Sequence, residues 1–233
     1  MNKKTVSIVM PVYQNEEKIE GIVRDFYKKL VLKLPGSEFI ITEDGSTDRT
    51  RDILRNLGKE LRLRLILSKE RKGYIKAVKE AFSLAAKELV LLSDSDGEHS
   101  PEDFWKLCNE MEKKNVDIVV GFKQKRRPYY RLILSRINNA LLGILFGISL
   151  HDANCGFRLM KKDVAKKIMP KTGTLKAAFN AEFTIRAKYE GYSYTEVPVP
   201  HTLVPSKVFS PKKLPLMLSK ELLRILKLKR ELR

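Results

Sequence analysis

The first 121 residues alternate between short apolar runs and longer segments whose apolar residues recur at helical spacing. The apolar runs, rich in β-branched residues, predict five strands: Thr5–Val12, Glu38–Thr42, Leu63–Leu67, Leu89–Ser93 and Val116–Gly121. The segments between them predict four helices: Glu17–Lys33, Thr47–Leu57, Gly73–Ala86 and Pro101–Lys113. Strands that alternate with such helices form βαβ units. The pattern therefore predicts an α/β domain with a doubly wound, mostly parallel sheet and helices on both faces.

Polar residues mark the starts of two of these helices. Ser100 is placed to cap the helix that begins at Pro101, and proline is favoured at a first helical position. Ser46 or Thr47 is expected to cap the helix after the second strand.

The regular alternation ends after residue 121. Further strands are predicted over Gly156–Met160 and Ser193–Val199, with a helix over Ala181–Glu190 between them. We expect one domain over residues 1–205, made of the halves 1–121 and 122–205, followed by a C-terminal segment over residues 206–233.

Two segments carry much of the positive charge. Lys123–Arg136 has six basic residues and no acidic one, and Ser206–Arg233 has nine Lys or Arg against two Glu. The second segment predicts a basic amphipathic helix. Its predicted cationic face holds Lys213, Lys220, Arg224 and Lys227. Its predicted apolar face holds Leu218, Leu222, Ile225 and Leu226. Such a helix can lie on an anionic membrane, or it can pack against the domain or a second copy.

The apolar stretch Leu132–Leu150 has two interpretations as well. It is interrupted by polar residues, which makes it unsuited to span a bilayer. It suits a helix in a membrane interface or a buried helix of the core.

The composition adds a large surplus of positive charge. The chain has 46 Lys and Arg against 28 Asp and Glu, a formal charge of +18, which predicts an anionic partner: a nucleic acid, a membrane surface or a phosphorylated ligand. A hydrophobic fraction of 43% argues against disorder. Two cysteines, Cys108 and Cys155, make no disulfide framework, and no signal peptide is visible. We therefore expect a cytoplasmic protein.

Acidic clusters follow the second and fourth predicted strands. The clusters Glu43–Asp48 and Asp94–Glu98 would meet at one edge of a parallel sheet, where ligands bind. Each cluster alone could be a solvated turn. Together, converging carboxylates repel one another unless a cation is bound, and a D-x-D triplet suits Mg²⁺ or Mn²⁺. No P-loop and no G-x-G-x-x-G motif is present, which disfavours ATPases and dinucleotide oxidoreductases.

Four motifs occur in one order along the chain. They are Val9–Glu17 (VMPVYQNEE), Glu43–Asp48 (EDGSTD), Asp94–Glu102 (DSDGEHSPE) and Asp152–Arg158 (DANCGFR). Together they resemble the motifs P-x-Y-N-E, D-D-G-S-x-D, D-A-D-L-Q-H-P-P-E and D-x-x-S-G-F-R of the family 2 glycosyltransferases. Within that family the chain is most similar to dolichyl- or polyprenyl-phosphate sugar synthases, such as dolichol-phosphate mannosyltransferase. The resemblance covers roughly residues 5–205 and implies the GT-A fold.

The resemblance implies roles for individual residues. Residues implied to hold the nucleotide are Pro11, Tyr13, Asn15, Glu16, Asp44 and Asp94. Residues implied to bind Mg²⁺ or Mn²⁺ are Asp94, Asp96 and Glu98. Residues implied to take part in catalysis are Asp96, Asp152 and Arg131. Residues implied to meet the phosphates or the acceptor are Arg127, Arg131, Arg158 and Lys207. The halves 1–121 and 122–205 would bind the nucleotide sugar and the acceptor.

The sequence departs from the family pattern at several positions. Glu43 replaces an Asp, and Cys155 replaces a Ser. Gly97 and Glu98 replace Leu-Gln, which adds a charge beside the metal and leaves the donor and metal preferences open. The Q-x-x-R-W motif of processive synthases is absent, and Trp105 is the single tryptophan. A processive polymerase is therefore not expected.

The resemblance implies inverting sugar transfer, by single displacement, from a GDP- or UDP-linked sugar to a polyprenyl phosphate. A lipid phosphate is already anionic and needs no base, whereas a saccharide hydroxyl would need one. Asp152 is the candidate base, and its other interpretation is a loop-bracing residue. We expect peripheral attachment at the cytoplasmic membrane face. The alternatives are a soluble family 2 glycosyltransferase with a saccharide acceptor and a non-enzymatic nucleic-acid-binding module. The module explains the charge but not the acidic clusters, so we expect no nucleic-acid partner.

Overall fold

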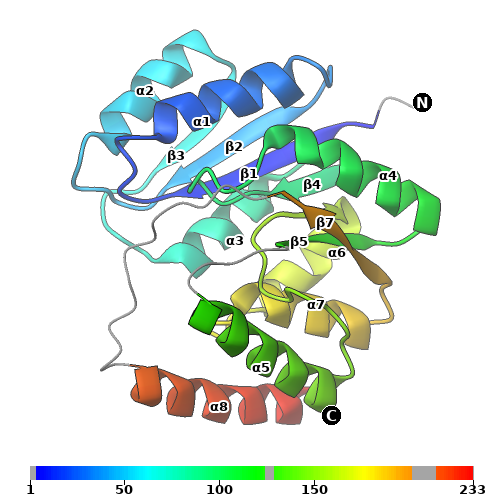
Figure 1. Cartoon of the computed structure of the whole chain (residues 1–233). Helices are drawn as coiled ribbons and strands as arrows, with labels where there is room; N and C mark the ends of the chain where they lie inside the picture. Colours follow the sequence, from blue (N-terminus) through cyan, green and yellow to red (C-terminus); the bar gives the residue numbers. More distant parts are fainter. Residues whose placement is uncertain (1–3, 124–128, 201–213, 233) are drawn as a thin grey trace.

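The computed structural model describes residues 4–123, 129–200 and 214–232, and the side chains of residues 129–134 and 214–218 are outside this description. Seven strands form one sheet in the order β3-β2-β1-β4-β6-β5-β7 (Figure 1). They are β1 Val6–Val12, β2 Glu38–Glu43, β3 Leu63–Leu67, β4 Leu89–Leu92, β5 Ile118–Lys123, β6 Arg158–Lys161 and β7 Tyr194–Val199. Strand β6 runs antiparallel to β4 and β5, while the other paired strands are parallel. The predicted mostly parallel α/β sheet is confirmed.

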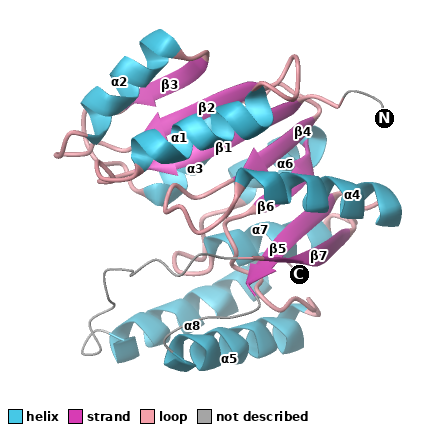
Figure 2. Cartoon of the chain, turned by 45° about the horizontal axis from the view of Figure 1, so that its top comes forward, coloured by secondary structure: helices cyan, strands magenta, loops and turns pink. Residues whose placement is uncertain are grey.

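Helices cover both faces of this sheet. The helices are α1 Ile19–Phe26, α2 Thr50–Glu60, α3 Tyr74–Leu84, α4 Phe104–Lys114, α5 Tyr129–Phe146, α6 Lys162–Ile168, α7 Phe179–Tyr189 and α8 Leu214–Glu231. Three shorter helical turns are η1 Tyr27–Val31, η2 Pro101–Asp103 and η3 Met169–Lys171. Helices α1, α2 and α4 lie on one face and α3, α6 and α7 on the other, while α5 and α8 lie beyond the sheet (Figures 1 and 2).

Of the two helix caps expected from the sequence, one is confirmed and one differs. Ser100 caps its helical turn as predicted, accepting a hydrogen bond from Glu102 N. Helix α2 begins at Thr50 rather than at Thr47. The reason is local, because Ser46 Oγ accepts from Gln14 N at 2.9 Å and Asp48 Oδ1 accepts from Thr50 N at 3.1 Å. The residues before α2 therefore form a loop that is bonded to the loop after β1. Helix α6 was not predicted.

The topology brings three loops together at one edge of the sheet. The chain runs from β1 outward to β2 and β3, and α3 then carries it back to β4 on the other side of β1. The strand order reverses between β1 and β4, and open α/β sheets bind ligands at such a switch point. The loops after β1, β2 and β4 are thus placed around one site.

The described part of the C-terminal segment belongs to the core. Ile225 and Leu228 of α8 are buried in the same apolar cluster as the sheet and its helices. Glu221 is buried and accepts hydrogen bonds from the backbone N–H groups of Ala177 and Ala178, at 3.0 and 3.2 Å. Glu231 accepts from the Arg186 guanidinium. Helix α8 is therefore anchored to α7 and the loop before it, and the predicted boundary at residues 205–206 lies outside the described residues.

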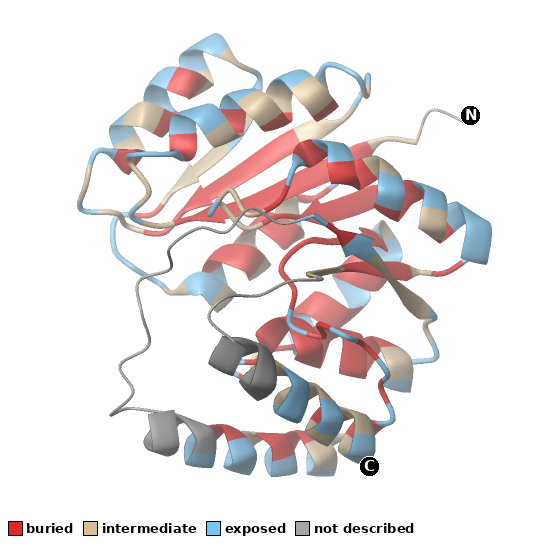
Figure 3. Cartoon of the chain, viewed as in Figure 1, coloured by how far each residue is buried: buried red, intermediate tan, exposed pale blue. Residues whose placement is uncertain are grey.

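The predicted faces of α8 need a correction. The predicted apolar face of Leu222, Ile225 and Leu226 is divided in the structure, since Ile225 is buried whereas Leu222 and Leu226 are exposed. Buried and exposed residues alternate along this helix (Figure 3). The inner face carries Glu221, Ile225 and Leu228, because the two glutamates bind the domain and fix the rotation of the helix. Lys213 and the side chain of Leu218 lie outside the described residues. No helix in the described ranges has the length and hydropathy needed to cross a bilayer.

Candidate active site

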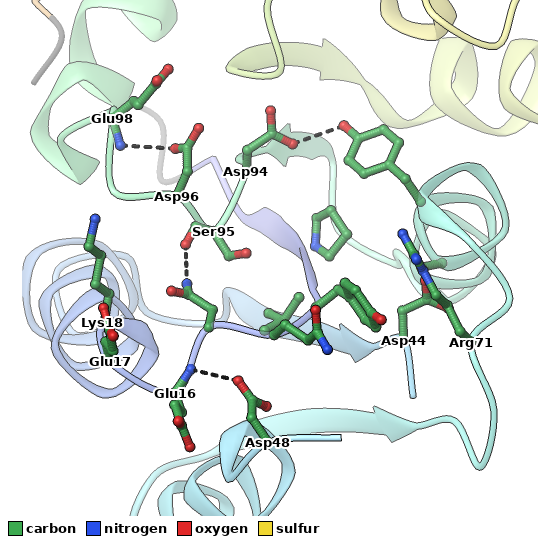
Figure 4. Close-up of a pocket in the computed structure, with 17 residues that line it drawn as sticks. Glu16, Glu17, Lys18, Asp44, Asp48, Arg71, Asp94, Ser95, Asp96 and Glu98 are labelled. Carbon is green, nitrogen blue, oxygen red and sulfur yellow. Dashed lines mark hydrogen bonds between the residues drawn. The ribbon is translucent and has the colours of Figure 1, made fainter. Parts of the chain in front are cut away.

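A pocket of about 730 Å³ opens at the carboxyl ends of β1, β2 and β4 (Figure 4). This volume is typical of small-molecule sites, which run from about 300 to 1,000 Å³. Its wall is dominated by polar and charged side chains from the three loops and the start of α3. The lining residues are Pro11–Lys18, Asp44, Asp48, Arg71, Tyr74, Ala77, Asp94–Asp96 and Glu98. All the residues predicted to bind nucleotide and metal are thus brought together.

The loop after β1 is tied to both neighbouring loops. The Asn15 side-chain amide donates to the carbonyl of Ser95, and Asn15 N donates to Thr50 Oγ1 at 2.8 Å. Glu16 Oε2 accepts from Arg49 N at 3.0 Å. These residues were predicted to hold the nucleotide directly. The structure shows that they also cross-link the three loops that shape the pocket.

The cluster after β2 is also rigidly held. Glu43 is fully buried, bonded to Ser46 N and to Arg51 Nε at 3.0 Å, which explains how the longer acid is accommodated here. Asp44 accepts from Lys72 N at 2.7 Å and from Gly73 N. Asp44 therefore positions the loop between β3 and α3 at the pocket edge.

Arg71 and Tyr74 line the pocket but were not among the predicted site residues. The Arg71 guanidinium carbon lies 4.1 Å from the centroid of the Tyr13 ring, a cation–π contact. Tyr74, the first residue of α3, donates a hydrogen bond to Asp94 Oδ1 at 2.9 Å. Their position after β3 was the available signal, because this loop also ends at the ligand-binding edge of the sheet.

The D-x-D carboxylates are crowded. Burial, and then the charge of Asp96, raise the pKa of Asp94 to about 6. Burial and the charge of Glu98 raise the pKa of Asp96 as well. Glu98 N donates to Asp96 Oδ1 at 2.9 Å, which holds the turn closed. Raised carboxyl pKa values mean that negative charge is disfavoured on these two side chains. A bound cation would offset this cost.

The carboxylate oxygens of Asp94 and Asp96 suit a hard divalent cation, whereas Glu98 has another partner. Glu98 forms an ion pair with Lys123, and within the described ranges no three acidic, histidine or cysteine side chains are grouped to hold a metal. Asp94, Asp96 and Glu98 are therefore not arranged as one group of three carboxylates in the described residues, and their metal-binding roles stay predictions. Asp94 and Asp96 remain as two oxygen ligands, which suits Mg²⁺ or Mn²⁺ sites that are completed by water and phosphate oxygens.

Arg158 does not have its predicted role. Its side chain is buried, with 1% of its surface exposed. The guanidinium makes five hydrogen bonds, which uses its five N–H donors. The acceptors are the carbonyls of Ala153, Cys155 and Asn180 and the Thr184 hydroxyl. Arg158 therefore braces the loop before β6 instead of facing a phosphate.

Asp152 is also buried and is not among the residues that line the pocket. Burial, and then the charge of Asp152, raise the pKa of the neighbouring Cys155 thiol to about 12. This placement favours the loop-bracing interpretation over a catalytic base. Arg127 and Lys207 lie outside the described residues, as does the side chain of Arg131 in α5, so their phosphate-binding roles stay predictions.

The comparison with family models decides the assignment. The model described as "Glycosyl transferase family 2" matches residues 7–169. The chain belongs to this family. The predicted family and the enzyme class are thereby confirmed, and the alternative of a non-enzymatic nucleic-acid-binding module is not supported.

Two relatives of this glycosyltransferase are named for lipid-phosphate sugar synthesis. Dodecaprenyl-phosphate galacturonate synthase of Rhizobium johnstonii is 28% identical over 70% of the chain, and the match spans 49% of that protein's length. Polyprenol monophosphomannose synthase of Mycolicibacterium smegmatis is 24% identical over 84% of the chain and 76% of its own length.

Solved structures share the fold of this glycosyltransferase. Glucosyl-3-phosphoglycerate synthase of Mycobacterium tuberculosis, in complex with Mn²⁺, UDP and glucosyl-3-phosphoglycerate, superposes with a TM-score of 0.74 at 17% identity. The superposition covers 97% of this chain and 80% of that one. The predicted GT-A fold is confirmed.

Proposed function

We propose that this glycosyltransferase transfers a sugar from a nucleotide sugar to a polyprenyl phosphate, with a divalent cation and inversion at the anomeric carbon. The observation that carries the proposal is the pair Asp94 and Asp96, crowded at the switch point of the sheet in a pocket of nucleotide-sugar size. The Mn²⁺ and UDP bound to the Mycobacterium tuberculosis neighbour, and the lipid phosphates in the relatives' names, support it.

The donor would be held by residues of the three loops. Asp96 and Asp94 would hold Mg²⁺ or Mn²⁺, which neutralises the diphosphate leaving group as its bond to the sugar breaks. Tyr13 and Arg71 form one wall of the pocket, and Asp44 fixes the loop that carries Arg71. These contacts pre-position the wall, so that little order has to be gained when the nucleotide binds.

The chemistry of the acceptor distinguishes transfer to a lipid phosphate from transfer to a saccharide. A phosphate monoester is anionic at neutral pH and attacks without a base, while a saccharide hydroxyl needs a base within hydrogen-bond reach. Asp152, the base predicted for a hydroxyl acceptor, is buried outside the pocket lining. This placement favours a phosphate acceptor over the soluble, saccharide-directed alternative.

A lipid acceptor requires contact with a membrane, and helices α5 and α8 offer a surface for it. The two helices lie side by side at the end of the molecule opposite β3 (Figures 1 and 2). We define the outer α5–α8 face by the exposed apolar side chains of the two helices: Ile137, Ile144, Leu222, Leu223 and Leu226. Ile144 is 83% exposed and Leu223 is 68% exposed.

The charges of these two helices indicate which kind of membrane surface the outer α5–α8 face would bind. The described part of these two helices exposes the cations Arg136, Lys220, Lys227 and Arg230. The acids of α8, Glu221 and Glu231, are bonded to the domain. Apolar residues flanked by cations match an anionic bilayer surface, where each basic residue contributes about 1 kcal/mol. We propose peripheral attachment through the outer α5–α8 face at the cytoplasmic side.

A transfer assay with a panel of labelled donors tests the function. UDP- and GDP-linked hexoses and hexuronates would be supplied with Mn²⁺ or Mg²⁺ and polyprenyl phosphate in detergent. We expect one donor to yield an organic-soluble labelled product, and chelation of the metal to abolish it. Labelling of a saccharide acceptor while every lipid phosphate stays unlabelled would overturn the proposal in favour of the soluble alternative.

A further inference from the structure

The carboxylate of Asp94 is held from two sides. On one side, the Tyr74 hydroxyl donates to Oδ1 at 2.9 Å (Figure 4). On the other side lies Gly156, where a Cβ would come within 1.9 Å of Asp94 Oδ2. A residue with any side chain at position 156 would therefore displace the carboxylate. The glycine explains the close approach, and the tyrosine supplies a hydrogen bond that fixes the orientation.

Tyr74 is itself fixed by the start of α7. Its ring meets Phe179 edge-on, with centroids 6.1 Å apart and an interplanar angle of 88°. Asn180 Nδ2 approaches the Tyr74 hydroxyl oxygen at 3.4 Å, and Asn180 N donates to Asn154 Oδ1 at 3.1 Å. The hydroxyl oxygen thus accepts from α7 while its proton points to Asp94. A chain of contacts runs from α7 through α3 to the D-x-D loop.

The contacts of Asp94 with Tyr74 and Gly156 oppose the effect of repulsion between the two crowded carboxylates. Asp96 repels Asp94, so an unrestrained Asp94 side chain would turn toward solvent and away from the pocket. A carboxylate that must share a cation with a diphosphate has to be in place before the nucleotide arrives. A hydrogen bond to a charged acceptor is among the stronger ones available for this purpose.

We propose that Tyr74 is a positioning residue, whose hydroxyl orients Asp94 toward the metal and the diphosphate without touching the reacting atoms. The inference rests on the proposed function, because it assigns Tyr74 a task only in a site that binds a metal–nucleotide complex. It adds a residue outside the four sequence motifs to the donor site.

Isothermal titration of the full chain with UDP·Mn²⁺ and GDP·Mn²⁺ tests this role. Tyr74→Phe removes the hydroxyl and keeps the ring against Phe179. We expect it to weaken binding of the preferred nucleotide by about tenfold, as expected for loss of a charge-assisted hydrogen bond that acts indirectly. Tyr189→Phe is the matched control, since Tyr189 is half exposed on α7 and packs against Phe146, and we expect it to bind like the wild type.

A double-mutant cycle separates positioning from a general structural role. If Tyr74 acts through Asp94, then Tyr74→Phe adds nothing to the loss caused by Asp94→Asn. We also expect excess Mn²⁺ to restore much of the turnover of Tyr74→Phe, by filling the weakened site. Additive losses, or unchanged nucleotide binding by Tyr74→Phe, would overturn the inference. A wild-type protein that binds neither nucleotide with Mn²⁺ would instead overturn the proposed function.

Discussion

The pocket and the outer α5–α8 face are built in opposite ways. In the pocket, carboxylates converge on loops that are held by hydrogen bonds between side chains and backbone, such as those of Asn15, Asp44 and Asp96. At the outer α5–α8 face, apolar side chains and cations point outward while Glu221 and Glu231 bind inward. The surplus of +18 is therefore not spread evenly. One region gathers negative charge where we propose a cation, and the other carries positive charge where we propose an anionic membrane surface.

The largest effect is expected at the pocket. Asp96→Ala removes a proposed metal ligand, so we expect turnover to fall by at least about 100-fold. It also relieves repulsion on Asp94, so we expect no loss of stability. Steady-state transfer and thermal unfolding would be measured together. Asp52→Ala, an exposed aspartate of α2, is the control and should leave turnover unchanged. Near-normal turnover of Asp96→Ala would refute the metal assignment.

The next effect is expected where α8 is anchored, and it concerns stability. Glu221→Ala leaves the N–H groups of Ala177 and Ala178 without their acceptor, which should lower the free energy of unfolding by about 2 kcal/mol. Urea denaturation measures it. The exposed neighbour Lys220→Ala should change stability by less than about 0.5 kcal/mol. Equal stability of the two variants would show that α8 is a loosely attached segment.

A smaller effect is expected at the outer α5–α8 face. Leu223→Glu should weaken binding to vesicles that contain phosphatidylglycerol by about tenfold, since it removes an apolar contact and adds a repelled charge. Flotation with such vesicles measures the binding. Leu32→Glu is the matched control, because Leu32 is 64% exposed but lies at the end of η1, in the half of the chain around β1–β3. If both variants lose the same affinity, or neither does, this face is not the docking surface.

A pH dependence of stability is expected from Asp94 in the pocket. The folded state holds the Asp94 proton up to about pH 6, whereas the unfolded chain releases it near 3.8. The contribution of Asp94 to stability therefore falls as pH rises through that interval, because the native state holds this proton more tightly. Asp94→Asn lacks this contribution. A shift of about two pKa units corresponds to about 3 kcal/mol, so we expect the variant to gain about 2 kcal/mol on the wild type between pH 4 and pH 7.

Urea midpoints across that pH interval, without metal, would show the convergence of the two curves at low pH. A constant difference between wild type and Asp94→Asn at every pH would mean that Asp94 titrates normally. The carboxylates would then not be crowded in the way the structure indicates.

The sequence predicted the pocket better than the helices at the other end. The residues Tyr13, Asp44 and Asp96 follow strands directly, and strand ends in a parallel sheet meet at one edge, so local patterns suffice there. Arg158 was misjudged because its carbonyl partners come from Ala153, Cys155 and Asn180, which only the folded chain brings together. The rotation of α8 could not be predicted for the same reason. Its leucines indicated one apolar face, but the long-range bonds of Glu221 and Glu231 decide which of its apolar residues are buried.

Tyr74 shows a further limit of sequence patterns. It follows Gly73 at the start of α3 with no motif around it, and its partner Asp94 is twenty residues away. A tyrosine at a helix start is usually a packing residue, and nothing local distinguishes this one. The distinction comes from the sheet topology, which places the end of β3 and the end of β4 around one pocket.

In the proposed reaction, the acceptor's own negative charge replaces a catalytic base. The most direct test supplies one donor and two matched acceptors, a polyprenyl phosphate and the polyprenol of the same chain length. Transfer to the phosphate, with none to the alcohol under the same conditions, is the predicted result. Transfer to the alcohol at a comparable rate would contradict the account, because it would require a base that activates a hydroxyl.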